Sequence, residues 1–372
     1  MMRSMVLGGV ILAIALLSSL AAARSEDVEI HGYGAWSYSR SDSDDNLYHD
    51  SSRAGNGGYH NLAVTFASQV TGNVRISTQV WWEESAGEES TATVDYAFGE
   101  WCVADALKLR MGQIKHPFGI YTEIYDVGTL RPFFWLPEGI YGPAGIVAES
   151  YRGVGLTGTT FNGGYQLDYD VYAGETDLDY ADLPDPDAED VVDEAGVESE
   201  GIALRDLVGG RFVVGMSNVD LRLGLSAYTG REDGESGERR SCAGALAEWN
   251  TGDWALRGEA VVVDEADDAD VVAAYAEVSR MIRGGWQVAA RADHSRTRLP
   301  EGQEPATSSM LRHRELTAGL NYWFAPDFVA KLSVSRVDGN RFARPGDLDA
   351  VLDGGELVQR TNLMSLGVQF AF

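Results

Sequence analysis

Apolar and polar residues alternate along much of the chain with a period of two. In the last ten residues, one side carries Met364, Leu366, Val368, Phe370 and Phe372, and the other side carries small or polar residues apart from Leu363. Because successive side chains of a strand point to opposite faces, this pattern predicts a strand with one apolar and one small or polar face. Strands of this kind are the unit of a transmembrane β-barrel.

Runs of this type recur along the whole chain, each about 9 to 15 residues long, which is the length that crosses a bilayer at a tilt. Residues 269–281 are the most ambiguous of them, because ADVVAAYAEVSRM is also compatible with a helix. The sequence predicts sixteen strands, at residues 28–40, 58–70, 73–84, 91–102, 107–115, 151–161, 164–174, 206–217, 219–229, 241–251, 253–264, 269–281, 285–296, 310–324, 326–338 and 359–372.

The connections between these runs alternate between short turns and long segments. The short ones have turn chemistry, as in Thr71-Gly72-Asn73 and Asn162-Gly163. Short turns at one end and long loops at the other are typical of an outer-membrane barrel, and an even strand count puts both termini on the periplasmic side. The pattern therefore predicts an all-β fold, a transmembrane antiparallel barrel of about sixteen strands. A soluble β-sandwich would not need this regular alternation.

Tryptophans gather beside the predicted short turns. Because amphipathic rings prefer the bilayer interface, these residues predict an aromatic girdle at the periplasmic edge. The five are Trp101, Trp249, Trp254, Trp286 and Trp323.

The N-terminal segment predicts export. A short basic start at Arg3 precedes an apolar run at Val6–Leu17, and small residues follow at Ala21–Ala23. This is the pattern of a secretory signal peptide, and the run is too short for a membrane-spanning helix. We therefore expect residues 1–23 to be a signal peptide and residues 24–372 to form one barrel. No later apolar run is long enough to span a bilayer as a helix.

Composition and chemistry narrow the function. A formal net charge of −28 argues against nucleic acid as a partner, because an acidic chain repels phosphates. The predicted strands place Cys102 and Cys242 at opposite ends of the wall, so we expect both thiols to be unpaired. The six histidines show no ligand spacing, and no nucleophile, phosphate-loop or zinc pattern stands out. We expect no enzymatic activity, no cofactor, no metal site and no catalytic residue.

Residues 107–150 carry the most specific motif. A strand ends in a run of the form GQ-x-K-x-PFG, formed by Gly112, Gln113, Lys115, Pro117, Phe118 and Gly119, and a long connection rich in aromatic residues, Pro and Gly follows. This segment resembles the Gram-negative porin superfamily of the sixteen-stranded general type. The terminal Phe370 and Phe372 resemble the signal by which outer-membrane proteins are recognised for assembly.

The resemblance implies a bacterial outer-membrane location, a homotrimer, and a water-filled channel through which small hydrophilic solutes and ions diffuse. Outer-membrane lipids and lipopolysaccharide are the implied surroundings. In general porins the third extracellular loop folds into the barrel and narrows the pore, and residues 116–150 hold that place. Independently, this segment is too apolar to remain in water, so we expect it to bury its aromatic residues against the lumen wall.

The charges suggest how such a constriction would select ions, because porin selectivity arises from pore width and rings of charge. On the loop, the candidate acids of the constriction are Glu123, Asp126 and Glu138. The candidate bases on inward strand positions are Arg75, Lys108, Arg110, Arg211, Arg222, Arg257, Arg291 and Lys331.

Other functions stay open at this stage. A solute-specific channel would use the loop aromatics as a track, whereas an adhesin or an outer-membrane enzyme would use the outer loops or a catalytic cluster. Residues 175–200 contain twelve acids and no base, which predicts a solvated loop and leaves divalent-cation binding as an alternative.

Overall fold

The structure is a computed structural model of the 372-residue chain. It describes residues 28–49, 51–84, 90–143, 145–178, 201–233, 237–264, 270–299, 308–345 and 358–372. The predicted signal peptide and most of the acidic segment 175–200 lie outside the described residues.

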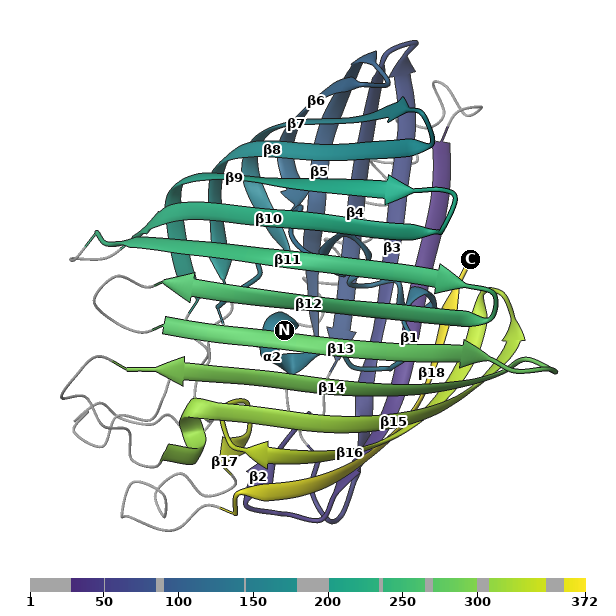
Figure 1. The fold of residues 1–372 in the computed structure, drawn as a ribbon, viewed down its shortest axis with the longest axis vertical. Helices are drawn as coiled ribbons and strands as arrows, with labels where there is room; N and C mark the ends of the chain where they lie inside the picture. The colour runs from purple at the N-terminus through teal and green to yellow at the C-terminus, as the bar shows by residue number, and fades with distance from the viewer. Residues whose placement is uncertain are drawn as a thin grey trace, which may run out of the picture.

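Sixteen antiparallel strands form one closed barrel, as the sequence predicts (Figure 1). Each strand pairs with its neighbours in the chain, and the order closes where β1 pairs with the last strand, β18. The strands are β1 Val28–Ser41, β3 Asn56–Thr71, β4 Val74–Glu84, β5 Thr91–Ala104, β6 Leu107–Lys115, β7 Ser150–Asn162, β8 Tyr165–Leu178, β9 Ile202–Met216, β10 Leu221–Glu232, β11 Arg239–Thr251, β12 Trp254–Asp264, β13 Asp270–Met281, β14 Trp286–Arg298, β15 Arg312–Ala325, β16 Phe328–Gly339 and β18 Arg360–Ala371.

Short elements occupy the connections. A two-stranded sheet joins β2, Asn46–Leu47, to β17, Arg344–Pro345. The connection after β6 contains the 3-10 helices η1 Thr122–Ile124 and η2 Gly128–Leu130 and the single turn α2 Glu138–Tyr141, and η3 Ser308–Leu311 precedes β15. No helix in the described part of the chain is long and apolar enough to cross a membrane.

The first and last strands meet in a tightly fitted seam. The backbone N–H of Gly32 donates to the carbonyl of Phe372, and the N–H of Phe372 donates to the carbonyl of Gly32, both at 2.9 Å. The rings of Phe370 and Phe372 lie over Gly34 and Gly32, so close that a Cβ on either glycine would collide with the ring. Glycine in β1 therefore makes room for the terminal aromatic rings, and closure leaves no unpaired strand edge.

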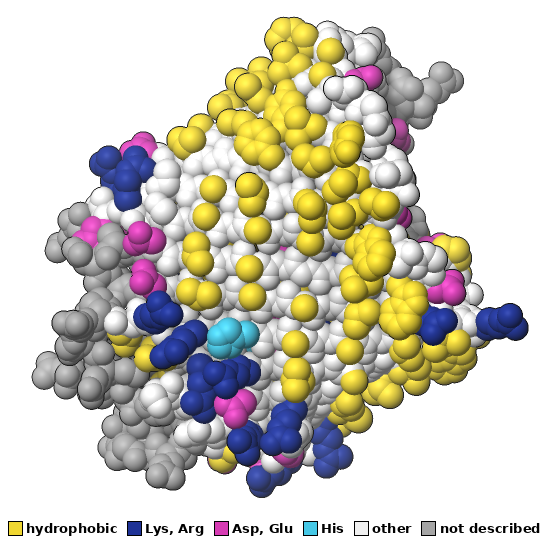
Figure 2. All heavy atoms as spheres, viewed as in Figure 1, with side chains coloured by type: hydrophobic (Ala, Val, Ile, Leu, Met, Phe, Trp, Pro, Cys, Tyr) yellow, Lys and Arg dark blue, Asp and Glu magenta, His cyan; other side chains and the backbone are white. Residues whose placement is uncertain are grey.

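The two faces of the wall differ in polarity as the alternation predicts. In β18, Met364, Leu366 and Phe370 are exposed on the outside, whereas Ser365 and Gln369 are buried on the other face. Figure 2 shows apolar side chains across the outer surface, with the larger ones toward the ends that carry the short turns. This arrangement provides an apolar outer band around a polar interior.

The tryptophan girdle is only partly as predicted. Trp101, Trp249, Trp254 and Trp286 are exposed beside short turns. Trp323 is not exposed in this way. It lies on the same face of β15 as the buried Asn321, and its indole N–H donates to the side-chain oxygen of Gln287 on the inner face at 3.3 Å. Its outward neighbours Tyr322 and Phe324 continue the girdle instead, with ring centroids 4.8 Å apart.

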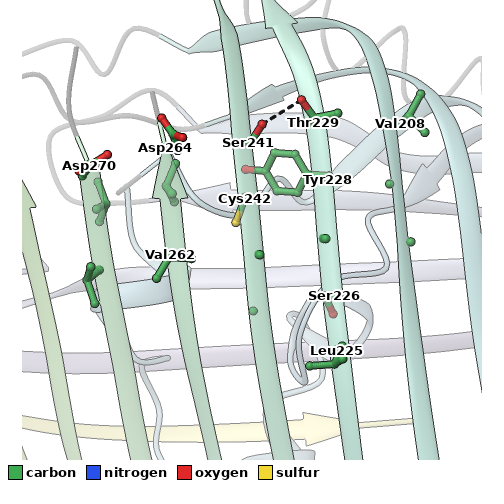
Figure 3. A pocket seen from close by; sticks show the side chains of 18 of the residues that line it. Val208, Leu225, Ser226, Tyr228, Thr229, Ser241, Cys242, Val262, Asp264 and Asp270 are labelled. Atoms are coloured by element: carbon green, nitrogen blue, oxygen red, sulfur yellow. Dashed lines mark hydrogen bonds between the residues drawn. The ribbon is translucent and has the colours of Figure 1, made fainter. Parts of the chain in front are cut away.

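A hollow of about 880 Å³ lies over β9 to β13 (Figure 3). Small residues such as Gly210, Ala227 and Ala243 line it, together with the Ser241 hydroxyl, which donates to that of Thr229 at 3.1 Å. We assign no chemistry to this hollow.

The two cysteines are unpaired, as predicted. Cys102 lies near the short turn that ends β5, whereas Cys242 is buried near the start of β11, at the long-loop end.

The seam gives the first testable prediction. Deletion of Phe372 removes the ring that covers Gly32 and the terminal backbone pair, whereas its replacement by Asn removes the ring alone, so we expect less folded barrel from both variants and the larger loss from the deletion. The measurement is the amount of heat-modifiable, SDS-resistant protein, with Ala371→Ser on the other face of the strand as the control. Equal folded levels for the deletion and the control would contradict this role.

Candidate functional site: the loop after β6 and the wall it contacts

The sequence motif builds the start of the long connection. The amide of Gln113 donates to the carbonyls of Val94 and Asp95, at 2.9 and 2.8 Å. The ammonium of Lys115 lies 2.8 Å from Asp95 and 2.9 Å from Asp126, so it ties β5 to the loop. Gly119 has a φ of +61°, and a Cβ there would collide with the Glu259 carboxylate across the barrel. Glycine is therefore required at this close approach.

Most of the large apolar side chains of this connection are buried or half-buried, as the sequence predicts, whereas Leu130 is exposed. Phe118, Tyr121 and Ile140 are at most 1% exposed, and Phe133, Phe134 and Leu136 are also buried. Ile124, Tyr125 and Trp135 are half-buried. Phe118, Tyr121, Leu136 and Ile140 share a hydrophobic cluster with wall residues such as Tyr228, Val261 and Tyr275. Burial of this area holds the loop to the wall.

Several wall bases donate hydrogen bonds to the backbone of the loop, among them Lys331, Arg257 and Arg291. The Lys331 ammonium contacts the carbonyls of Gly128 and Arg131 at 2.6 Å and that of Phe133 at 3.3 Å. Arg257 donates to the carbonyl of Leu130 at 3.2 Å, and Arg291 donates to that of Trp135 at 2.9 Å. These bases hold the loop in place.

Three wall acids accept hydrogen bonds from the loop. Glu259 accepts from the Ile120 N–H at 2.6 Å and from the Tyr141 hydroxyl at 2.5 Å. Glu277 accepts from the Tyr121 hydroxyl at 2.8 Å, and Asp293 accepts from the Gly139 N–H at 2.9 Å. The short helix α2 also packs against β13 and β14, and in Figure 1 it lies behind the front strands. The loop therefore lies along the polar face of β12 to β16.

Each of the three predicted loop acids lies within ion-pair distance of a basic side chain. Glu123 forms an ion pair with Arg211, which also contacts Asp170 at 3.0 Å. Although burial opposes it, the Arg211 guanidinium lowers the pKa of the Glu123 carboxyl. Asp126 pairs with Lys115 and accepts from Gln79 at 2.7 Å.

Glu138 differs from the other two acids. Its carboxylate lies 3.5 Å from the imidazole of His49, whose ring stacks on Trp135 at 4.0 Å between centroids. Burial, reinforced by the carboxylates of Glu315 and Asp293 against the opposing charge of His313, raises the pKa of Glu138 to about 7. At neutral pH its carboxyl is therefore only partly ionised.

Three of the remaining predicted bases pair with acids of the wall. Arg75 pairs with Glu29 at 2.5 Å near a short turn, Arg110 pairs with Glu100 at 2.7 Å, and Arg222 pairs with Glu248 at 2.8 Å. Lys108 is half-buried at the start of β6. The structure thus brings Arg211, Arg257, Arg291 and Lys331 to the loop and leaves the other four on the wall below it.

A cavity of about 280 Å³ remains between the loop and the opposite wall, formed by β1, β3 and β4. The wall contributes aromatic and polar side chains, and the loop contributes both signs of charge. The charged and aromatic lining residues are Tyr59, Trp81, Glu83, Tyr125, Asp126, Arg131, Trp135 and Glu149. This mixed lining suits a hydrated passage better than an apolar ligand pocket.

Sequence reasoning missed several of these residues. Arg131 lies on the loop itself, so the search for bases on strand positions did not reach it. The wall acids Glu259, Glu277 and Asp293 lie at strand positions whose side chains face inward. The alternation of inward and outward side chains along the strand is the one sequence signal that identifies them.

Comparison with known proteins supports the fold. No family model matches the chain, and no curated protein matches it. Among solved structures, Salmonella typhi OmpF in complex with daunomycin is similar at a TM-score of 0.60 and 11% identity, over 93% of this chain and 97% of that one.

Two further structures cover 93% of this chain and 99% of their own, at 10% identity and a TM-score of 0.56. They are an anion-selective porin from Comamonas acidovorans and the trimer form of OmpT, an outer membrane protein of Vibrio cholerae. The chain therefore has the closed sixteen-stranded fold of outer-membrane porins.

The contacts of Lys331 give a second prediction. Lys331→Met removes a donor to three loop carbonyls, and charge-assisted bonds contribute about 1.5–3 kcal/mol each. We expect amide hydrogen exchange in residues 128–133 to accelerate by roughly tenfold or more. The control is Lys108→Met, near the short turn after β5. Unchanged exchange in the Lys331 variant would show that the wall does not hold the loop.

Proposed function

We propose that the protein is an outer-membrane porin that lets small hydrophilic solutes and ions diffuse passively through a water-filled lumen. The observation that carries this proposal is the pairing of a polar inner face with an apolar outer band on a closed barrel. A barrel of sixteen strands is wide enough to leave an aqueous channel. The similarity to the anion-selective porin from Comamonas acidovorans supports the same function.

The loop formed by residues 116–150 would narrow this channel from within. Its contacts with Glu259, Glu277, Arg257, Arg291 and Lys331 all fall on the polar face of β12 to β16. The remaining space lies toward β1, β3 and β4, where the cavity of about 280 Å³ would be the constriction. Charges at a narrow gap act strongly on passing ions because little water screens them.

We also propose that the mature chain begins after a cleaved signal peptide and assembles as a homotrimer among outer-membrane lipids and lipopolysaccharide. The trimer form of Vibrio cholerae OmpT supports the assembly, since that barrel has the same architecture. Residues Phe370 and Phe372 would serve as the assembly signal, consistent with their place at the closing seam.

A solute-specific channel is the second candidate. Tyr59, Trp81 and Trp135 line the cavity beside Arg131 and Glu83, and aromatic faces next to opposite charges suit a sugar or a zwitterion. Saturable uptake of one solute in liposomes would favour this function over general diffusion.

Ion selectivity tests the proposed constriction. In planar bilayers, we expect the triple variant Glu123→Gln, Asp126→Asn, Glu138→Gln to shift the reversal potential toward anions, because Arg211 and Lys115 each lose one of their two counter-charges. Arg131→Gln should shift it toward cations. The control is Glu29→Gln, at the start of β1.

The contradicting result is an unchanged reversal potential in both variants. Charges in a wide lumen are screened within about 8 Å at physiological salt, so such a result would place the loop outside the narrow part of the pore. Wild-type protein that fails to conduct at all would contradict the porin function itself.

A further inference from the structure

Three ligand-type side chains meet near the long-loop ends of β14 and β15. Asp293 lies directly opposite Glu315 in the register of the two strands, and His313 precedes Glu315 by two residues, so all three point to the inner face. One donor atom from each lies within 4.8 Å of the others. The side chains of His313 and Asp293 are 0% exposed, and that of Glu315 is 8% exposed.

Several polar atoms of this cluster lack the hydrogen bonds that buried groups normally make. Among the described residues, neither ring nitrogen of His313 makes a bond of hydrogen-bond geometry, although Nε2 faces both carboxylates. The Oδ1 of Asp293 and the hydroxyl of Ser295, the strand partner of His313, also make no such bond. Because a buried polar group without a partner is costly, such a concentration in one place indicates a bound species.

The distances favour a shared cation over an ion pair. His313 Nε2 lies 3.5 Å from Asp293 Oδ2 and 3.7 Å from Glu315 Oε2. An imidazolium that binds a carboxylate directly would lie at about 2.7–2.9 Å. Ligands at about 2.0–2.1 Å around a tetrahedral zinc ion lie roughly 3.3–3.4 Å from each other, which is closer to the observed spacing.

Neighbouring groups orient the carboxylates as they do around protein-bound metals. Asp293 Oδ2 accepts from the Gly139 N–H at 2.9 Å, and Glu315 Oε1 accepts from the Thr317 hydroxyl at 2.6 Å. The aromatic rings of Tyr48 and Phe342 cover His313, with centroids 6.3 and 5.0 Å away. Arg291 Nη2, 3.7 Å from Glu315, is the nearest competing cation.

We propose that Asp293, His313 and Glu315 form a binding site for a divalent transition metal of the zinc type. One imidazole and two carboxylates suit Zn²⁺ or Co²⁺ better than Ca²⁺, which takes an all-oxygen shell. The bound ion neutralises the buried carboxylates and, through Asp293 and the Gly139 N–H, fixes α2 against the barrel wall. The site is independent of what passes through the lumen.

The test uses the full mature protein, refolded in detergent and stripped with a chelator. Zn²⁺ is added with a large excess of Mg²⁺, which suppresses weak binding to exposed acids. We expect one Zn²⁺ per chain by mass spectrometry after gel filtration, and Co²⁺ should give the visible absorption of a tetrahedral site. His313→Gln should weaken the affinity by about 100-fold or more, since lesser changes around metal ligands cost 10–100-fold.

The matched control is His294→Gln, since His294 lies on the same strand as Asp293 but on its other face. It should bind Zn²⁺ like the wild type. If His313→Gln fails to fold, Zn²⁺ binding is measured on Glu315→Gln and Asp293→Asn instead. Folding of each variant is checked by its heat-modifiable mobility on a gel. Absence of retained Zn²⁺ in the wild type, or retention in the folded ligand variants, would overturn the proposal.

Discussion

The closed hydrogen-bond ladder of the wall is the constraint on which the rest of the structure depends. The pairing of β1 with β18 satisfies the strand edges that an open sheet would leave unpaired. Once the sheet closes, the period-two alternation sends every second side chain inward and the others outward. The apolar surface in Figure 2 and the buried polar residues of the inner face are two results of this closure.

Closure creates a second requirement, because the inner face carries charged groups that are expensive to bury without partners. The long connection after β6 meets much of this requirement. Its backbone carbonyls accept from Lys331, Arg257 and Arg291, and its N–H and hydroxyl groups donate to Glu259 and Glu277. The aromatic side chains of the same loop are removed from water when they pack against the wall. The hydrogen-bonding groups of the loop and of the wall are therefore complementary.

The strands were predictable from the sequence because alternation is a local signal. All sixteen predicted runs correspond to strands, including residues 269–281, where pairing with β12 and β14 favours a strand over a helix. The sequence predictions were wrong where the direction of one side chain or the start of a strand was concerned. Trp323 faces inward, and β9 begins at Ile202, before the predicted start at residue 206, because the strands extend beyond the apolar band.

The site was less predictable because its contacts join segments far apart in the chain. Burial of the loop aromatics followed from their composition alone. The hydrogen bonds from Lys331 to the loop carbonyls could not be predicted in this way. A base at an inward strand position gives the same sequence pattern whether its side chain meets passing ions or backbone carbonyls. Asp293, His313 and Glu315 also escaped a search for histidine spacing, because a cross-strand pair brings them together.

Liposome swelling tests most directly the claim that the loop narrows a water-filled barrel. Protein reconstituted in liposomes is exposed to neutral sugars of increasing size, and the swelling rate is compared with that of a variant in which residues 120–147 are replaced by a short Gly-Ser linker. We expect the wild-type rate to fall steeply with sugar size and the variant to admit larger sugars at nearly undiminished rates. The same size dependence in both proteins, or no swelling with either, would contradict the account.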